Sequence, residues 1–198
     1  MSDAIADAKR ALRADLRERR NLLSPQARDA AADGIRTQLD ALVDKHRARS
    51  VSCFLSTTTE PGTREFVDAA VERGIRVLLP ITRADGLLDW SVATAGIDIA
   101  EGMFGLPEPV GELLGPIAVN SVDLLIVPAA AVDRTGMRLG WGRGFFDKTL
   151  GSMERCPPVY AVVYDSEVLD EVPSDLHDQR VTGVVTPTRT VTFAPARS

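Results

Sequence analysis

Apolar residues recur at helical spacing through the first part of the chain. Between residues 4 and 20, alanine and leucine form one stripe and charged residues fill the other positions, which predicts an amphipathic helix. A second helix is expected from Ser24 and Pro25, because the serine side chain can accept hydrogen bonds from free backbone amides and proline suits the first helical position. Apolar residues spaced for a single face extend this helix to about Val43.

Short apolar runs bounded by polar residues follow and predict buried strands. The first two, at residues 51–55 and 75–79, are separated by a helix expected over 63–73 that ends at a glycine. Strand, helix and strand in this order predict a right-handed βαβ unit with parallel strands. A further strand is expected at 87–92, and the glycine- and proline-rich segment 94–121 is predicted to be irregular.

The second half of the chain begins with its strongest strand pattern. Residues 122–127 are apolar except for Asp123, which predicts a central strand. The pattern then predicts a glycine-rich loop, a helix, a buried strand, a short helix or turn and a last strand, at 133–144, 145–150, 159–164, 166–170 and 181–185. This alternation predicts one α/β domain spanning residues 1–198, with helices on both faces of a mostly parallel sheet.

Composition and charge narrow the range of functions. The chain has 198 residues, 44% of them hydrophobic, and a net charge of −5, so no overall positive field favours nucleic acid or an anionic membrane. No apolar stretch reaches the roughly 18 residues of a membrane span, and the N-terminus lacks a signal-peptide core, which predicts a cytoplasmic protein. The two cysteines, Cys53 in an apolar run and Cys156 in a loop, indicate neither a disulfide framework nor a thiolate metal site.

The loop after the central strand is the strongest candidate for chemistry. Gly140, Gly142 and Gly144 alternate, which allows the backbone to approach a ligand closely and to form an anion-binding nest of amides. Arg138 and Arg143 add donors that match phosphate geometry. The spacing is that of neither a Walker A loop nor a Rossmann fingerprint, and a turn that merely reverses the chain is the alternative.

Four further residues are candidates with simpler alternatives. Asp147 could hold Mg²⁺ beside a phosphate or provide charge at a helix N-terminus, and Asp178 could be a second ligand or a solvated loop residue. His177 is interpreted as structural. Lys9 and Arg13 lie four residues apart on one helical face, where they could reach phosphates or form a solvated charged face.

The segment at 123–150 reads DLLIVPAAAVDRTGMRLGWGRGFFDKTL and resembles the signature of the 5-formyltetrahydrofolate cyclo-ligase (methenyltetrahydrofolate synthetase) family. Other landmarks follow in the family order: KRALR at residues 9–13, FLS at 54–56 followed by Glu60, residues 104–109, and VP at 172–173 followed by HD at 177–178. The resemblance covers nearly the whole chain. It implies a three-layer α/β/α sandwich and a ligase that uses ATP and Mg²⁺ to convert 5-formyltetrahydrofolate into 5,10-methenyltetrahydrofolate, ADP and phosphate.

Carried over position by position, the resemblance implies three sets of site residues. The ATP set is Lys9, Arg10, Arg13, Arg138, Leu139, Gly140, Trp141, Gly142, Arg143, Gly144, Phe145 and Phe146, in which Arg138 and Arg143 are the catalytic charges. The folate set is Leu55, Glu60, Phe104, Trp141, Gly142, Arg143, Gly144 and Phe145. The Mg²⁺ set is Asp147 and Asp178.

Three departures from the family pattern keep alternatives open. Phe145-Phe146 replaces a pair that is usually Tyr-Tyr, Trp141 stands where a smaller, basic or tyrosine residue is common, and Asp175-Leu176 stands where Glu and Pro are frequent. The alternatives are a nucleotide-binding paralogue without folate activity and a sugar-phosphate isomerase-like enzyme, with a non-enzymatic role as a third. In each enzymatic case we expect small-molecule partners only and a monomer.

Overall fold

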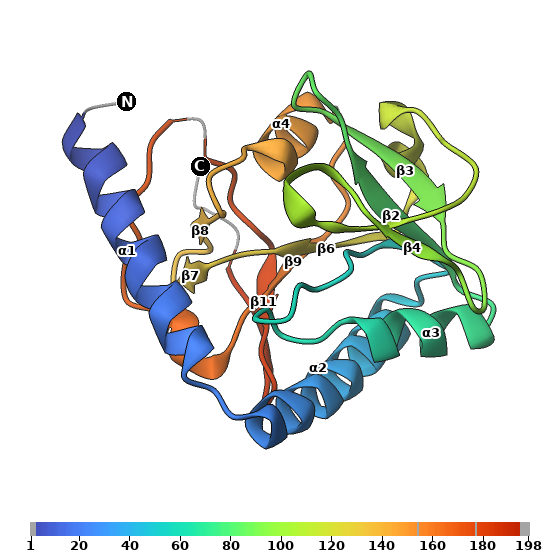
Figure 1. Ribbon diagram of the computed structural model, residues 1–198, viewed down its shortest axis with the longest axis horizontal. Helices are drawn as coiled ribbons and strands as arrows, with labels where there is room; N and C mark the ends of the chain where they lie inside the picture. The colour runs from blue at the N-terminus through green and yellow to red at the C-terminus, as the bar shows by residue number, and fades with distance from the viewer. Residues whose placement is uncertain (1–2, 154, 177, 195–198) are drawn as a thin grey trace.

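A seven-stranded sheet runs through the centre of the molecule (Figure 1). The computed structural model describes residues 3–153, 155–176 and 178–194. Five parallel strands in the order β11-β9-β6-β1-β2 are flanked by the antiparallel strands β12 and β3. The bounds are β1 Ser50–Ser52, β2 Arg76–Thr82, β3 Leu88–Val92, β6 Leu124–Pro128, β9 Val159–Val162, β11 Gly183–Val185 and β12 Thr190–Thr192.

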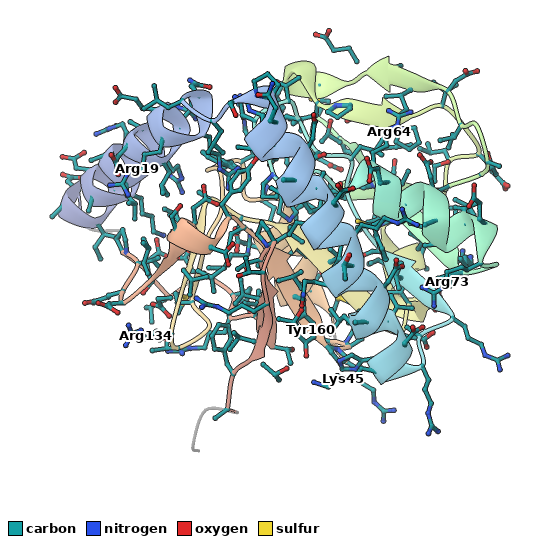
Figure 2. All side chains as sticks on the ribbon, turned by 90° about the horizontal axis from the view of Figure 1, so that it is seen from below. Arg19, Lys45, Arg64, Arg73, Arg134 and Tyr160 are labelled. Atoms are coloured by element: carbon teal, nitrogen blue, oxygen red, sulfur yellow. The ribbon has the colours of Figure 1, made fainter. Side chains whose placement is uncertain are left out.

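Helices α2 (Pro25–His46) and α3 (Arg64–Glu72) cover one face of this sheet, as Figure 2 shows from below. Ser24 caps α2 as predicted, accepting a 3.2 Å hydrogen bond from the Ala27 amide. Apolar residues of both helices pack in one core cluster with residues of the sheet: Ile35, Leu39, Phe66, Val67, Val51 and Leu124. The expected βαβ unit of β1, α3 and β2 is therefore confirmed.

The opposite face of the sheet carries α4 (Phe145–Ser152) and the 3₁₀ helix η2 (Pro116–Ser121). They share a second core cluster with the sheet, which includes Trp90, Leu125, Val127, Val119, Phe145 and Leu150. Helices on both faces of a mostly parallel sheet confirm the predicted α/β/α class. No helix within the described ranges combines the length and the apolar character of a membrane span.

Helix α1 (Asp3–Asn21) lies at one side of the molecule beside a small three-stranded sheet (Figure 1). This sheet has the order β10-β7-β8, with bounds Val168–Leu169, Ala131–Asp133 and Arg138–Leu139. Leu16 is buried in a third cluster with Ala131 and Leu139, and Leu12 packs against it. Helix α1 therefore rests on the segments that flank the glycine-rich loop.

The segment at 94–121 is more ordered than predicted. It contains the antiparallel hairpin β4 (Ile99–Glu101) and β5 (Pro107–Pro109), joined by the 3₁₀ turn η1 (Met103–Gly105). Phe104 has a left-handed backbone with φ of 64°, and Gly105 follows with φ of 72°. Two successive left-handed residues reverse the chain tightly and place an aromatic side chain at the tip of the hairpin.

Two predicted strands are shorter than the apolar pattern suggested. The first ends at Ser52, after which the chain leaves the ladder. The central strand begins after Asp123, because this carboxylate accepts hydrogen bonds from the amides of Arg49 (2.8 Å) and Ser50 (2.9 Å) and so joins the starts of two strands. These bonds, the Arg49 amide first, lower the pKa of Asp123. The predicted short helix or turn at 166–170 is the 3₁₀ helix η3 (Asp165–Glu167) followed by β10.

Candidate functional site

A cavity of about 460 Å³ opens where the central parallel strands end. Its wall includes Phe54 and Leu55 after β1, Pro80 of β2 and Pro128 of β6. The carboxyl ends of parallel strands are the usual ligand-binding edge of an open α/β sheet. Helix α1 contributes Arg17 and Asn21 to the same wall, and these two residues were not predicted from the sequence.

Aromatic rings dominate one part of the cavity. Trp141, Phe145 and Phe146 come from the glycine-rich loop and the start of α4, and Phe104 comes from the hairpin tip. The rings of Phe104 and Phe145 have centroids 6.2 Å apart at 49°, and the Arg143 guanidinium lies 3.7 Å from the centre of the Phe104 ring. Such a wall suits a flat ring system, which can stack or meet the aromatic edges.

Two glutamates line the cavity, and the carboxylate of each is anchored through one oxygen. Glu60 Oε2 accepts from the amide (2.9 Å) and the hydroxyl (3.0 Å) of Thr57. Glu108 Oε1 accepts from the Thr82 amide (2.9 Å) and from the Thr82 hydroxyl. Glu60 was predicted, whereas Glu108 was missed, because its position depends on how the β4–β5 hairpin folds against β2. Fixed carboxylates suit a ligand that presents N–H donors.

The glycine-rich loop forms the other side of the cavity. Gly142 and Gly144 have φ of 93° and 74°, which non-glycine residues rarely adopt. Arg138 is buried, donating from Nη1 to the Pro128 carbonyl at 3.1 Å and from Nη2 to Asp147. Its Nε is buried and has no hydrogen-bond partner among the described residues. Two predicted loop residues, Leu139 and Gly142, do not line the cavity: the Leu139 side chain packs with α1, and Gly142 lies beside Arg13.

Two basic side chains of helix α1 make contacts on this side of the molecule: Arg13 with the loop, and Lys9 with the chain near Asp178. Arg13 Nε donates a 2.7 Å hydrogen bond to the Gly140 carbonyl. Lys9 is buried and forms ion pairs with Asp175 (3.1 Å) and Asp178. Burial opposes the charged ammonium of Lys9, but the hydrogen bonds and charges of the two aspartates outweigh it and raise the pKa of Lys9. The alternative of a solvated charged face is therefore wrong for Lys9 and Arg13.

Arg10 lies apart from this group. Its side chain is 76% exposed and pairs with Asp7 of the same helix. The structure thus brings eleven of the predicted site residues around the cavity, places Arg13 against the loop and pairs Lys9 with Asp178, but it leaves Arg10 at the surface. The eleven are Leu55, Glu60, Phe104, Arg138, Gly140, Trp141, Arg143, Gly144, Phe145, Phe146 and Asp147.

The two predicted metal ligands, Asp147 and Asp178, are of the type that suits Mg²⁺. Within the described part of the chain, no three or more histidine, cysteine or acidic side chains gather as a metal site. Asp147 and Asp178 both act on the charge of Arg13, which lies between the loop and the chain near Asp178. Mg²⁺ is commonly held by one or two carboxylates together with substrate phosphates, so two carboxylates are a suitable donor set. His177, which was interpreted as structural, lies outside the described residues.

The fold and the cavity define a class: an α/β protein with a cavity at the carboxyl edge of its sheet, in which aromatic rings and anchored carboxylates adjoin a basic, glycine-rich loop. The family model of 5-formyltetrahydrofolate cyclo-ligases matches residues 5–187. The chain therefore belongs to the 5-formyltetrahydrofolate cyclo-ligase family.

Relatives agree with this assignment over nearly their whole length. A 5-formyltetrahydrofolate cyclo-ligase of Mycolicibacterium smegmatis is 38% identical over 187 residues, which cover 92% of this chain and 95% of the relative. The Escherichia coli protein of that name is 27% identical and covers 88% of this chain and 97% of its own. The solution structure of Aquifex aeolicus 5,10-methenyltetrahydrofolate synthetase superposes with a TM-score of 0.79 at 25% identity, covering 96% of this chain and 95% of that one.

Proposed function

We propose that the protein catalyses the ATP-dependent cyclisation of 5-formyltetrahydrofolate to 5,10-methenyltetrahydrofolate, with release of ADP and phosphate. The observation that carries the proposal is one cavity in which aromatic rings and anchored carboxylates adjoin the basic glycine-rich loop. The family membership and the names of the relatives support the same reaction. The paralogue and isomerase alternatives gain no support from them.

The folate is proposed to occupy the aromatic side of the cavity. The pterin ring presents N–H donors and a flat surface, which match the Glu60 carboxylate and the rings of Trp141 and Phe145. Leu55 adds an apolar contact and Phe104 closes the hairpin side. Gly142, Arg143 and Gly144 are assigned to the edge where folate and ATP meet.

The triphosphate is proposed to lie along the loop at residues 138–146. Its amides and the basic residues Arg138 and Arg143 would neutralise phosphate charge. Lys9 and Arg13 are proposed to add charge from α1. Arg10 is assigned to the same group by family position only, since in the ligand-free protein its exposed side chain pairs with Asp7.

Asp147 and Asp178 are the residues that would hold Mg²⁺, which supplies positive charge to the phosphates when it is bound. In the ligand-free protein Arg138 and Lys9 pair with these two carboxylates. Nucleotide binding then exchanges partners, because the basic side chains can move to phosphate oxygens while the carboxylates are freed. Such an exchange leaves no buried charge without a partner in either state.

The chain acts mainly by positioning in this reaction. The formyl oxygen attacks the γ-phosphorus and ADP leaves, so that the formyl oxygen becomes part of a phosphate ester. N10 of the folate then attacks the formyl carbon and loses its proton, and phosphate departs with the former formyl oxygen. Both steps need aligned reactants and neutralised charge rather than a nucleophilic side chain, which agrees with a cavity built from rings, arginines and backbone amides.

The test is the ultraviolet absorbance of the methenyl product, followed with purified protein, 5-formyltetrahydrofolate and Mg²⁺, with and without ATP. We expect product only with ATP, and one ADP for each methenyl group. A folded protein that binds ATP without forming product would establish the paralogue alternative. Turnover of sugar phosphates without ATP would establish the isomerase alternative. A monomer in the cytoplasm remains a prediction.

A further inference from the structure

A buried ion pair joins the last turn of α1 to the 3₁₀ helix η3, which is far from it in the sequence. Arg20 is 1% exposed, and Glu167 of η3 is 3% exposed. Two parallel hydrogen bonds join them, from Arg20 Nε to Glu167 Oε1 at 2.6 Å and from Nη2 to Oε2 at 2.7 Å. Nη2 also donates to the Ala129 carbonyl at 3.0 Å. The guanidinium plane is therefore fixed in both position and orientation.

This guanidinium lies over the tryptophan ring of the glycine-rich loop. Arg20 Cζ lies 4.8 Å from the centre of the Trp141 ring and 5.4 Å from that of Tyr164. Trp141 lines the cavity, whereas Arg20 does not. A cation over an aromatic face attracts it most strongly when both are shielded from water, so Arg20 acts on the cavity through Trp141.

Stability alone explains this cluster poorly. Arg20 Nη1 and Trp141 Nε1 are buried and have no hydrogen-bond partner among the described residues. A buried ion pair is often no more stable than apolar side chains of similar size, and donors without a partner add a further cost. Burial raises the pKa of the Glu167 carboxyl and the hydrogen bonds from Arg20 oppose this, so the ionised pair depends on both members.

We propose that Arg20 is a positioning residue: held by Glu167, it fixes the Trp141 ring at the cavity wall and thereby sets the affinity for the ring system that binds there. The identity of that ligand as a reduced folate rests on the proposed function. The orientation of Trp141 does not, since it is a property of the ligand-free protein.

The test needs a variant that leaves no buried charge alone. Arg20→Met combined with Glu167→Leu removes both charges and keeps similar volume, whereas Arg20→Met alone could fail to fold. Arg19→Met is the matched control, because Arg19 is the neighbouring residue on α1, is largely exposed and pairs only with Asp15 among the described residues (Figure 2). The chain has two tryptophans, so the difference between each protein and its Trp141→Phe derivative isolates the emission of Trp141.

We expect acrylamide quenching of Trp141 to rise at least about twofold in the double variant, and KM for 5-formyltetrahydrofolate to rise about tenfold. KM for ATP should change less than about twofold, and Arg19→Met should match wild type. A folded double variant with wild-type quenching of Trp141, or one in which both KM values rise equally, overturns the proposal. If the wild type forms no methenyl product, the proposed function fails, and the quenching result alone decides whether Arg20 positions Trp141.

Discussion

Single side chains decide how the cavity treats its ligands. Phe145 and Phe146 lack the hydroxyl groups of the usual tyrosine pair, so they bind only by packing and stacking. Trp141 provides the largest ring of the loop, and the Arg20 guanidinium lies over this ring. The cavity therefore depends more on apolar contact and less on hydroxyl hydrogen bonds than the family pattern suggests.

The first prediction concerns these rings. Phe145→Tyr should change kcat/KM for 5-formyltetrahydrofolate by less than about tenfold, because a net hydrogen bond contributes about 0.5–1.5 kcal/mol. Trp141→Ala should raise KM for folate more than KM for ATP, since it removes a stacking surface. Steady-state kinetics with each substrate varied separately measures both effects. An inactive wild type that Phe145→Tyr restores would contradict this and favour the paralogue.

The second prediction concerns Asp147. Asp147→Ala should lower the initial rate at limiting Mg²⁺ and ATP by about 10–100-fold, because the loss of a metal ligand or of its close partner often has an effect of this size. It also leaves Arg138 buried without its carboxylate, so the variant should be less stable by up to about 3–5 kcal/mol. Initial rates over a range of Mg²⁺ concentrations, together with urea unfolding, separate the two effects.

Asp170→Ala is the control for this variant, because Asp170 forms an exposed pair with Arg134. Surface pairs of this kind contribute about 0–1 kcal/mol, so the control should keep its stability. If Asp147→Ala turns over like wild type at limiting Mg²⁺, the metal assignment is wrong.

At the scale of elements, helix α1 carries basic residues to the site: Arg13 contacts the glycine-rich loop and Lys9 pairs with Asp178. Lys9 and Arg13 lie on one face of the helix and contact the loop and the chain near Asp178. Leu16 and Arg20 anchor the C-terminal half of the same helix. The N-terminal half of the helix therefore provides positive charge near the loop, and its C-terminal half packs the helix against the rest of the protein.

The third prediction is a truncation. Removing residues 1–14 takes away Lys9 and Arg13 but leaves Leu16 and Arg20, so the protein should fold and its KM for ATP should rise roughly tenfold or more, since charge-assisted hydrogen bonds contribute about 1.5–3 kcal/mol. Circular dichroism and kinetics check the two parts. A well-folded truncation with normal ATP affinity would mean that this part of α1 only packs.

The fourth prediction follows from the raised pKa of Lys9. A lysine whose pKa is higher in the folded protein contributes stability that is complete below the unfolded value of 10.5 and is lost as the pH rises through the folded value. The free energy of unfolding should therefore fall more steeply above pH 10.5 in wild type than in Lys9→Met. Lys45→Met, at an exposed position on α2, should behave like wild type (Figure 2). Equal slopes in all three proteins would count against the buried pairing.

The elements differ in how clearly the sequence pattern predicts them. Helices α1 and α2 show helical periodicity because each buries one face, and the buried strands stand out as continuous apolar runs because both of their faces are covered. Strands β7 and β8 are two or three residues long, too short for any period, and β4 and β5 contain the glycine- and proline-rich pattern of a loop. Strand β7 also pairs with a partner far along the chain, since Val132 lies opposite Val168 of β10.

The same distinction holds for the site. The loop residues and Glu60 could be predicted, because the spacing of glycines and arginines and the family pattern mark them. Arg17, Arg20 and Glu108 could not, because only the tertiary fold brings Arg17 and Glu108 to the cavity wall and Arg20 against Trp141. An exposed arginine on an amphipathic helix and one buried under a loop look the same along the chain.

At the scale of the whole molecule, the two halves of the chain meet in the middle of the sheet. Strand β1 pairs with β6, so β1, β2 and β3 form one flank and the later strands form the other. Both large core clusters contain residues of both flanks. Neither half can bury its apolar face alone.

The fifth prediction is therefore a single unfolding transition for residues 1–198, which remain one domain by prediction. The calorimetric enthalpy of unfolding should equal the van't Hoff enthalpy, because neither flank is stable without the other. The measurement is differential scanning calorimetry at several scan rates. Two resolved transitions would divide the chain into separate domains.

The pair of Arg20 and Glu167 has a consequence for the moment of synthesis. Helix α1 leaves the ribosome before the other described elements, yet the partner of its Arg20, Glu167, is 147 residues further along the chain. The strand that covers the open edge of β1 is also late, since β6 begins at Leu124. The nascent protein thus carries an amphipathic helix and an unpaired strand edge through most of elongation, which are features that aggregate or recruit chaperones. A ribosome that stalls before Glu167 leaves a chain in which Arg20 of α1 has no carboxylate to pair with.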